Sequence, residues 1–398
     1  MTRPCLEGVL AAVLCLTQVA TLSHADDLRN YIPTATEFPP HNSGVYLAGE
    51  LVVVDPINRR AGIRLDGDGN SQRYLTGPLH YFAMLPCGEV WFNGAAATLR
   101  DIPLGTHVQG YFYLPPKGEE ETIPPPLEEF ASLIPRHNHA VSLEDDMSFY
   151  KRRGQSWKIE SLDFETNKVH VESVGTAARD GLSEQQTFDF DQATRVWREG
   201  RLVNMRDIEP GTVVQLNLGW AAGWQDGEFG LDDVWLDEES QAQAAELQRR
   251  RNVRYHRIRW LPGRIESVEN FDFGGGLVTI ALYGGVAKQI HDELHAAKEK
   301  RVAVAAAEHT LRTWRHRSDR KFGKLLKWET VENPRPGFSG IRIHMKFTEL
   351  IDHYRPGNSV RIKSDDWLFV SVPPEERIKS FEDRDDSRRL VLPEANQE

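Results

Sequence analysis

The sequence predicts a mainly β protein built from three tandem small β-barrels, the third of which carries a helical insertion. Two observations favour this fold class. One stretch of the chain recurs at a fixed offset, and each copy begins with two short strand patterns around a tight turn. Strand pairs followed by a glycine-containing loop and a closing strand are typical of small closed barrels. Closure also removes free strand edges, which would otherwise promote aggregation.

The internal repeat is the strongest signal in the chain. Residues 90–109 match residues 196–215 at ten of 20 positions without a gap, at an offset of 106 residues. The shared motif reads Arg-Asp-Ile, two variable residues, then Gly-Thr, and its glycines are Gly105 and Gly211. Glycine supplies a turn backbone that accepts positive φ. A third copy of the turn is indicated at Pro356-Gly357-Asn358, where the Arg-Asp-Ile triplet is missing.

These units resemble the OB-like small β-barrel repeats of uncharacterised secreted bacterial proteins. The resemblance rests on the strand–turn–strand opening and on the repeated Arg-Asp-Ile motif, and it implies an architecture without implying an activity. It covers three barrels at residues 45–115, 156–220 and 260–372.

The remaining ranges are expected to form linkers between the barrels, an insertion in the third barrel and a tail. A linker is predicted over 116–155, where residues 115–127 are rich in Pro and Glu, and an acidic-to-basic helical linker is predicted over 221–259. In the third unit, apolar residues at helical spacing predict one helix over 286–315, within an insertion spanning 286–336. Charged residues 373–398 predict a disordered tail.

The amino terminus has the composition of an export signal. Arg3 precedes an apolar stretch from Val9 to Leu22, and Ser23-His24-Ala25 ends with small residues at the positions that a signal peptidase reads. A signal peptide over 1–25 predicts an exported protein, periplasmic or secreted; the alternative is a buried amino-terminal helix. No later segment has 18 consecutive apolar residues, so no integral membrane segment is expected after signal removal.

Two basic runs stand against an acidic background of net charge −11. Residues 248–260 contain six arginines and no acid, and residues 311–328 contain seven Lys or Arg and one Asp, with three interleaved aromatic residues. Guanidinium groups match phosphate, sulfate and carboxylate, and aromatic rings stack on bases or sugars. The candidate anion-binding residues are Arg254, Arg257, Arg259, Arg312, Arg315, Arg317 and Lys321.

The predicted partner of this basic-aromatic surface is an anionic glycan or a nucleic acid, and export favours the glycan. Residues 226–239 carry seven Asp or Glu and no base, so an acidic arm folded over the basic face is the alternative. Trp91, Trp197 and Trp314 recur at equivalent places, which favours barrel-core positions over a binding platform.

His291 and His295 are candidate metal ligands. They lie four residues apart, so a helix would present both on one face, where they could share a zinc ion. The metalloprotease motif has Glu after the first His, whereas this chain has Asp292, and no third ligand is evident. The other interpretation is a solvated helix rich in Lys, Glu and His.

The sequence therefore predicts a non-catalytic binding or scaffolding protein of the cell envelope, with no cofactor. The duplicated residues belong to turns and cores, and no set of acid, base and nucleophile can be assembled. A metal-dependent hydrolase using His291 and His295 is the enzymatic alternative. A third hypothesis is an assembly module whose barrels only pack against one another, and such a module could self-associate. The ligand and the oligomeric state stay open.

Overall fold

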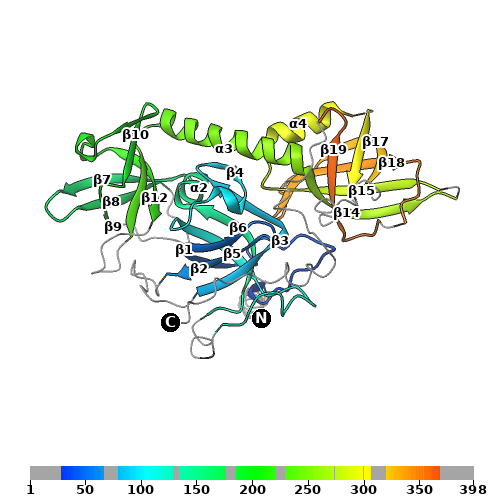
Figure 1. Ribbon diagram of the computed structural model, residues 1–398, viewed down its shortest axis with the longest axis horizontal. Coiled ribbons are helices and arrows are strands. Elements are labelled where there is room, and N and C mark those ends of the chain that lie inside the picture. The colour runs from blue at the N-terminus through cyan, green and yellow to red at the C-terminus, as the bar shows by residue number, and fades with distance from the viewer. Residues whose placement is uncertain are drawn as a thin grey trace, which may run out of the picture.

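The computed structural model describes residues 28–66, 79–126, 128, 134–175, 185–219, 229–272, 274–298, 300–305, 320–352 and 354–367. The predicted signal peptide at 1–25 and the predicted tail at 373–398 lie outside these ranges. The described strands form three closed barrels, as the sequence predicted. Barrels 1, 2 and 3 are numbered here in chain order (Figure 1). No helix in the described ranges is long and apolar enough to cross a membrane.

Barrel 1 has the strand order of an OB-fold. Strand β1 pairs with β2 and β5, strand β2 pairs with β3, and β6 closes the barrel between β5 and β3. The β3–β6 pair is parallel, and the others are antiparallel. The elements are β1 (Val45–Asp55), β2 (Arg60–Leu65), β3 (Leu79–Phe92), β4 (Ala95–Ala97), η1 (Leu99–Asp101), β5 (His107–Tyr113) and β6 (His139–Asp145).

Barrel 2 repeats this order. Strand β13 runs parallel to β9 and β10 and antiparallel to β12, and β12 pairs with β7 in antiparallel orientation. Its elements are β7 (Gln155–Asp163), β8 (Lys168–Gly175), β9 (Gln185–Asp189), β10 (Arg195–Arg198), β11 (Arg201–Val203), η3 (Met205–Asp207), β12 (Val213–Gly219) and β13 (Gly230–Trp235).

The predicted repeat extends to individual backbone bonds in all three barrels. The N–H groups of Gly105, Gly211 and Gly357 donate to Leu51, Ile159 and Ile265 at 2.8, 2.7 and 2.8 Å. The three glycines have φ of 92°, 91° and 90°, which only glycine adopts without strain. The first strand of each barrel also carries a register shift just after the accepting residue. The third copy is thus equivalent at this turn, even though its Arg-Asp-Ile triplet is absent.

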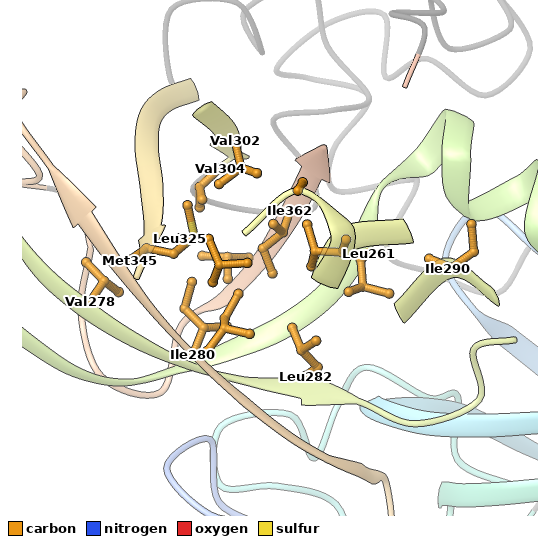
Figure 2. Packing of buried hydrophobic residues seen from close by; sticks show 14 of the residues in the cluster. Leu261, Val278, Ile280, Leu282, Ile290, Val302, Val304, Leu325, Met345 and Ile362 are labelled. Carbon is orange, nitrogen blue, oxygen red and sulfur yellow. The ribbon is translucent and has the colours of Figure 1, made fainter. Parts of the chain in front are cut away.

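Barrel 3 closes with antiparallel pairs alone, in the order β14-β15-β18-β17-β16-β19. Its core is mostly aliphatic and is drawn in Figure 2 with residues of β14 to β19 and with Ile290 from the adjoining helix. The strands are β14 (Leu261–Asn270), β15 (Gly276–Tyr283), β16 (Arg301–Ala305), β17 (Arg320–Thr330), β18 (Phe338–Phe347) and β19 (Ser359–Ser364).

The insertion in barrel 3 is only partly helical. Helix α4 spans Lys288–Ala296, and the chain continues as β16 instead of extending the helix to 315 as the spacing predicted. Val302 and Val304 alternate with other residues and are fully buried, so a strand places both in the core. The insertion therefore supplies one helix and the β16–β17 hairpin that completes the barrel.

The two ranges expected as connections contribute to the barrels themselves. Strand β6 lies within 116–155 and β13 lies within 221–259, and each is followed by a helix. These helices are α2 (Asp146–Arg152) and α3 (Glu238–Arg259). Helix α3 runs from barrel 2 across barrel 1 to barrel 3 (Figure 1), packing on the all-alanine strand β4. Small side chains there permit the close approach of helix and strand.

A buried polar cluster joins barrel 1 to barrel 2. Asp146 at the start of α2 accepts hydrogen bonds from His107 Nδ1 at 2.7 Å and from the Leu218 backbone at 3.0 Å. The neighbouring Asp145 accepts one from Asn217 Nδ2 at 2.8 Å. Since His107 belongs to barrel 1 and the other two donors to barrel 2, the two carboxylates fix the orientation of one barrel against the other.

Candidate functional site: a basic face on barrel 3

The predicted anion-binding arginines of α3 have unequal environments. Arg257 forms an ion pair with Glu293 of α4, with Nε 3.1 Å from Oε2, and Trp367 Nε1 donates to the same carboxylate. Arg259 is 9% exposed. Arg254 is exposed to solvent. Part of the run 248–260 thus holds α3 against α4. Of these three arginines, only Arg254 is both exposed and without an ion pair to α4.

The second predicted group consists of Lys321 in the β16–β17 hairpin and of three arginines between the two strands in the sequence. Lys321 lies in β17 and is half-buried. Arg312, Arg315 and Arg317 lie outside the described residues, between Ala305 and Arg320 in the sequence, and these two residues form the last pair of the hairpin. Their environments therefore remain sequence-based expectations.

The structure reveals a row of three cations that the sequence analysis did not identify. Arg301, Lys324 and Lys346 lie directly opposite one another on β16, β17 and β18. Each is exposed, and each strand carries buried core residues at the alternate positions, so the three side chains share the outer face of barrel 3. We call these three residues the cationic row.

An aromatic ring lies beside the cationic row. The Arg301 guanidinium is 4.1 Å from the ring centroid of Phe322, and the Arg320 guanidinium is 5.1 Å from it. At the other end of the row, Lys346 Nζ is 5.8 Å from the ring centroid of Phe271. Planar cations next to aromatic faces suit a ligand that has both negative charges and flat or ring-shaped units.

Glu329 on β17 has cationic partners outside the row. Glu329 forms ion pairs with Lys327, with His344 at 3.3 Å and with Arg342 at 3.7 Å. Within the described residues, no ion pair with a carboxylate is found for Lys324 or Lys346. The cationic row therefore carries an excess positive charge.

The acidic segment 226–239 contributes to barrel 2 where it is described. Asp233 in β13 pairs with Arg195 at 2.6 Å and accepts from Trp197 Nε1 at 2.7 Å. Asp237 caps α3 by accepting from the Ser240 backbone at 2.7 Å. These carboxylates have partners in their own barrel and helix, and neither pairs with the cationic row.

His291 and His295 both lie on α4, but their surroundings differ. His291 is 7% exposed, and burial lowers its pKa to about 4. The ring of His295 packs against Trp328, with centroids 4.8 Å apart. Asp292, at the position of the metalloprotease Glu, pairs with Lys288 at 2.7 Å. In the described part of the chain, no group of three or more His, Cys, Asp or Glu is arranged to hold a metal ion.

The cationic row escaped sequence analysis because it depends on strand register. Arg301 was read as part of a helix, and Lys346 lies outside both basic runs. The available signal was the alternation of Val302 and Val304, which places Arg301 on the opposite face of a strand. The partners of Arg301 across the sheet could not be read from any local pattern.

Comparisons with known proteins give little further information. No family model matches the chain, and no curated protein matches it. Among solved structures, a Cu(II)-bound Trp-to-Ala variant of CusF from Escherichia coli is 15% identical, with 21% of this chain and 90% of that chain covered and a TM-score of 0.16. A Ag(I)-bound CusF is 17% identical, with 21% and 95% covered and a TM-score of 0.15.

Proposed function

We propose that this chain is an exported, non-catalytic binding or scaffolding protein of the cell envelope that holds an anionic glycan on the outer face of barrel 3. The observation that carries the proposal is the cationic row of Arg301, Lys324 and Lys346. Like charges placed directly opposite one another across a sheet destabilise the fold. A row of three of them is accounted for by a polyanion that neutralises it.

The surroundings of the row support a polymeric ligand. The row crosses three neighbouring strands, which are about 4.8 Å apart in a sheet, so its charges extend over roughly 10 Å. Phe322 and Phe271 lie at its two ends. Arg312, Arg315 and Arg317 connect the two strands of the hairpin in the sequence, and we include them in the proposal as further contacts of the same ligand. Lys321 is not included, because it lies opposite the fully buried Val304 and therefore leaves β17 on the face opposite the cationic row.

The rest of the fold suits a rigid scaffold. Helix α3 spans all three barrels, and Asn252 Oδ1 accepts from the Ala287 backbone at 2.9 Å just before α4 begins. The buried Asp145 and Asp146 join barrel 1 to barrel 2. These contacts would hold the face of barrel 3 in a fixed orientation relative to barrels 1 and 2. Barrels 1 and 2 would then be available to contact another partner, such as a second copy of the chain.

The test is a binding titration with three probes: polygalacturonate, a single-stranded oligonucleotide and neutral dextran. We expect polygalacturonate to bind and dextran not to bind, with an affinity that falls steeply with salt concentration. The variant Lys324→Gln, Lys346→Gln should reduce both the affinity and the salt dependence. The control variant Lys117→Gln, Lys298→Gln removes the same charge from exposed positions elsewhere and should bind like the wild type.

Three results would overturn the proposal. They are the absence of polygalacturonate binding at low salt, equal losses in the two double variants, and tighter binding of the oligonucleotide than of the glycan. The last result would assign the face to a nucleic acid. Light scattering during the titration shows whether binding is accompanied by self-association.

A further inference from the structure

A second candidate binding site lies between barrels 1 and 3. It is a cleft of about 930 Å³, bounded by β3, β6, α2 and α3 and by the segments before α4 and β18. This volume is in the range of small-molecule sites. The lining includes five cations against two acids, Glu89 and Glu144. The cations are Arg152, Arg153, Arg249, Lys288 and Arg335.

One wall of the cleft is a preorganised arginine–tryptophan pair. The Arg152 guanidinium lies 4.1 Å from the ring centroid of Trp91. Glu144 is 3% exposed and holds both Arg152, at 3.0 Å, and Arg153, at 3.5 Å. One buried carboxylate therefore orients both guanidinium groups on this wall of the cleft. Trp91 is half-buried and lines the cleft, so the expectation that it is only a core residue is wrong.

Comparison of the two repeats shows that Glu89 lacks the close ion pair of the corresponding carboxylate in barrel 2, although the Arg152 guanidinium acts on it electrostatically. In barrel 2, Trp197 donates to Asp233, and Asp233 is neutralised by Arg195 at 2.6 Å. Arg195 is the counterpart of Glu89, because the repeats are offset by 106 residues. In barrel 1, Trp91 Nε1 donates to Glu89 Oε2 at 3.1 Å, and no ion pair of Glu89 is found among the described residues.

Barrel 3 is shaped to leave room for this carboxylate. A Cβ on Gly284 would come within 1.9 Å of Glu89 Oε1, so a larger residue at position 284 would displace the Glu89 carboxylate. Arg335, on the same side of the cleft, is exposed, and its Nη1 donates to the Phe38 carbonyl at 3.2 Å. An acceptor, an aromatic ring and cations thus converge on one space from two barrels.

We propose that this cleft binds a small acidic sugar, with its carboxylate or sulfate at Arg152, Arg153 and Arg335 and its hydroxyl groups at Glu89. Sugars combine an apolar ring face, which packs on aromatic side chains, with hydroxyl groups that donate to carboxylates. An acidic substituent adds the charge that the arginines complement. The cleft is distinct from the cationic row, and the proposal does not depend on the function of that row.

The test is calorimetry of the full chain with glucuronic acid, glucose 6-sulfate and glucose, accompanied by NMR of the Trp91 indole N–H. We expect saturable binding of at least one acidic sugar, a shift of the Trp91 signal and no detectable binding of glucose. Arg335→Gln and Glu89→Gln should each weaken binding by about tenfold or more, as expected for hydrogen bonds to charged groups. The carboxylate and sulfate probes distinguish the two acidic groups.

Lys324→Gln is the matched control, because it removes a charge from the cationic row and leaves the cleft intact. Unchanged sugar binding in this variant separates the cleft from the proposed glycan face. The proposal is overturned if neither acidic sugar binds, if glucose binds equally well, or if both cleft variants bind like the wild type. Thermal unfolding of each variant verifies that a lost signal reflects binding and not misfolding.

Discussion

Asp145 and Asp237 occupy equivalent positions in barrels 1 and 2. Each caps the helix that follows the last strand of its barrel. Each also accepts a hydrogen bond from the backbone N–H of the first turn residue in a hairpin of its own barrel, β3–β4 or β10–β11. The two hairpin bonds, from Asn93 and from Glu199, are both 2.8 Å long. The repeated unit is therefore a barrel together with its capped helix, which explains why α2 and α3 begin where they do.

The first prediction concerns this cap. Asp237→Ala removes the acceptor of the Ser240 and Glu199 N–H groups, and we expect it to lower the free energy of unfolding by about 1–2 kcal/mol. The neighbouring substitution Glu239→Ala removes a charge without removing the cap and should cost less. Urea denaturation measures both, and hydrogen exchange at Ser240 should accelerate only in Asp237→Ala. Equal costs would contradict the assigned role.

The second prediction concerns the pH dependence of the contact between barrels 1 and 2. Burial alone would lower the pKa of His107, but Asp146 and Asp66, at 2.7 and 2.9 Å, raise it to about 10. A histidine with a raised folded-state pKa stabilises the fold below its unfolded pKa of about 6.5. That stability is lost as the pH rises through about 10. We expect the unfolding temperature to fall between pH 7 and pH 10.

His107→Gln tests this assignment. It leaves two carboxylates without their buried cation, so we expect a loss of about 3–5 kcal/mol at pH 7. The difference in stability between wild type and variant should shrink as the pH approaches 10, because the wild type loses the same charge. A difference that stays constant across this range would show that His107 is neutral at pH 7.

The third prediction concerns His291 on the acidic side. Burial lowers its pKa to about 4, so between about pH 6.5 and 4 the unfolded chain takes up a proton that the folded chain does not. The free energy of unfolding must then decrease as the pH falls through this range. His80 and His256, with pKa values lowered to about 4 and about 3 by burial, contribute in the same direction.

His291→Leu removes one of these contributions. Nε2 of His291 is buried and has no hydrogen-bond partner among the described residues, so an apolar side chain of similar size should be neutral or stabilising at pH 7. We also expect a smaller loss of stability between pH 7 and pH 4.5. His295→Leu, at an exposed position of the same helix, is the control. A large loss of stability at pH 7 would show that Nε2 has a partner such as a metal ion, which elemental analysis would detect.

The sequence predicted what depends on local backbone conformation. The glycine turns at 105, 211 and 357 were recognisable because their positive φ restricts the residue type. Strands β6 and β13 were assigned to connections because their pairing is non-local. Strand β6 joins β3 in parallel through residues more than 50 positions away, with a register shift between Met84 and Glu89. Nothing in a short window specifies such pairing.

The sequence indicated that basic residues gather in barrel 3, but it did not indicate which of them share one face of the sheet. The basic run at 311–328 favoured a binding surface on barrel 3, and it contains one member of the cationic row, Lys324. Arg301 and Lys346 joined the site only through cross-strand register. Conversely, Arg257 and Arg259 looked available in the sequence, yet one is paired with Glu293 and the other is buried. Charge counts do not distinguish a free guanidinium from one that a neighbouring helix neutralises.

The fourth prediction separates stability from binding at the cationic row. Lys324 lies between Arg301 and Lys346, so Lys324→Gln removes two unfavourable cross-strand contacts at once. We expect the free energy of unfolding to increase by about 0.2–1 kcal/mol, while the affinity for polygalacturonate decreases. Lys117→Gln, at an exposed position after β5 of barrel 1, should change neither. Urea denaturation at low salt measures the first effect, and the gain should diminish as added salt screens the repulsion. A variant that is destabilised and binds normally would assign Lys324 a structural role within barrel 3 and remove it from the proposed site.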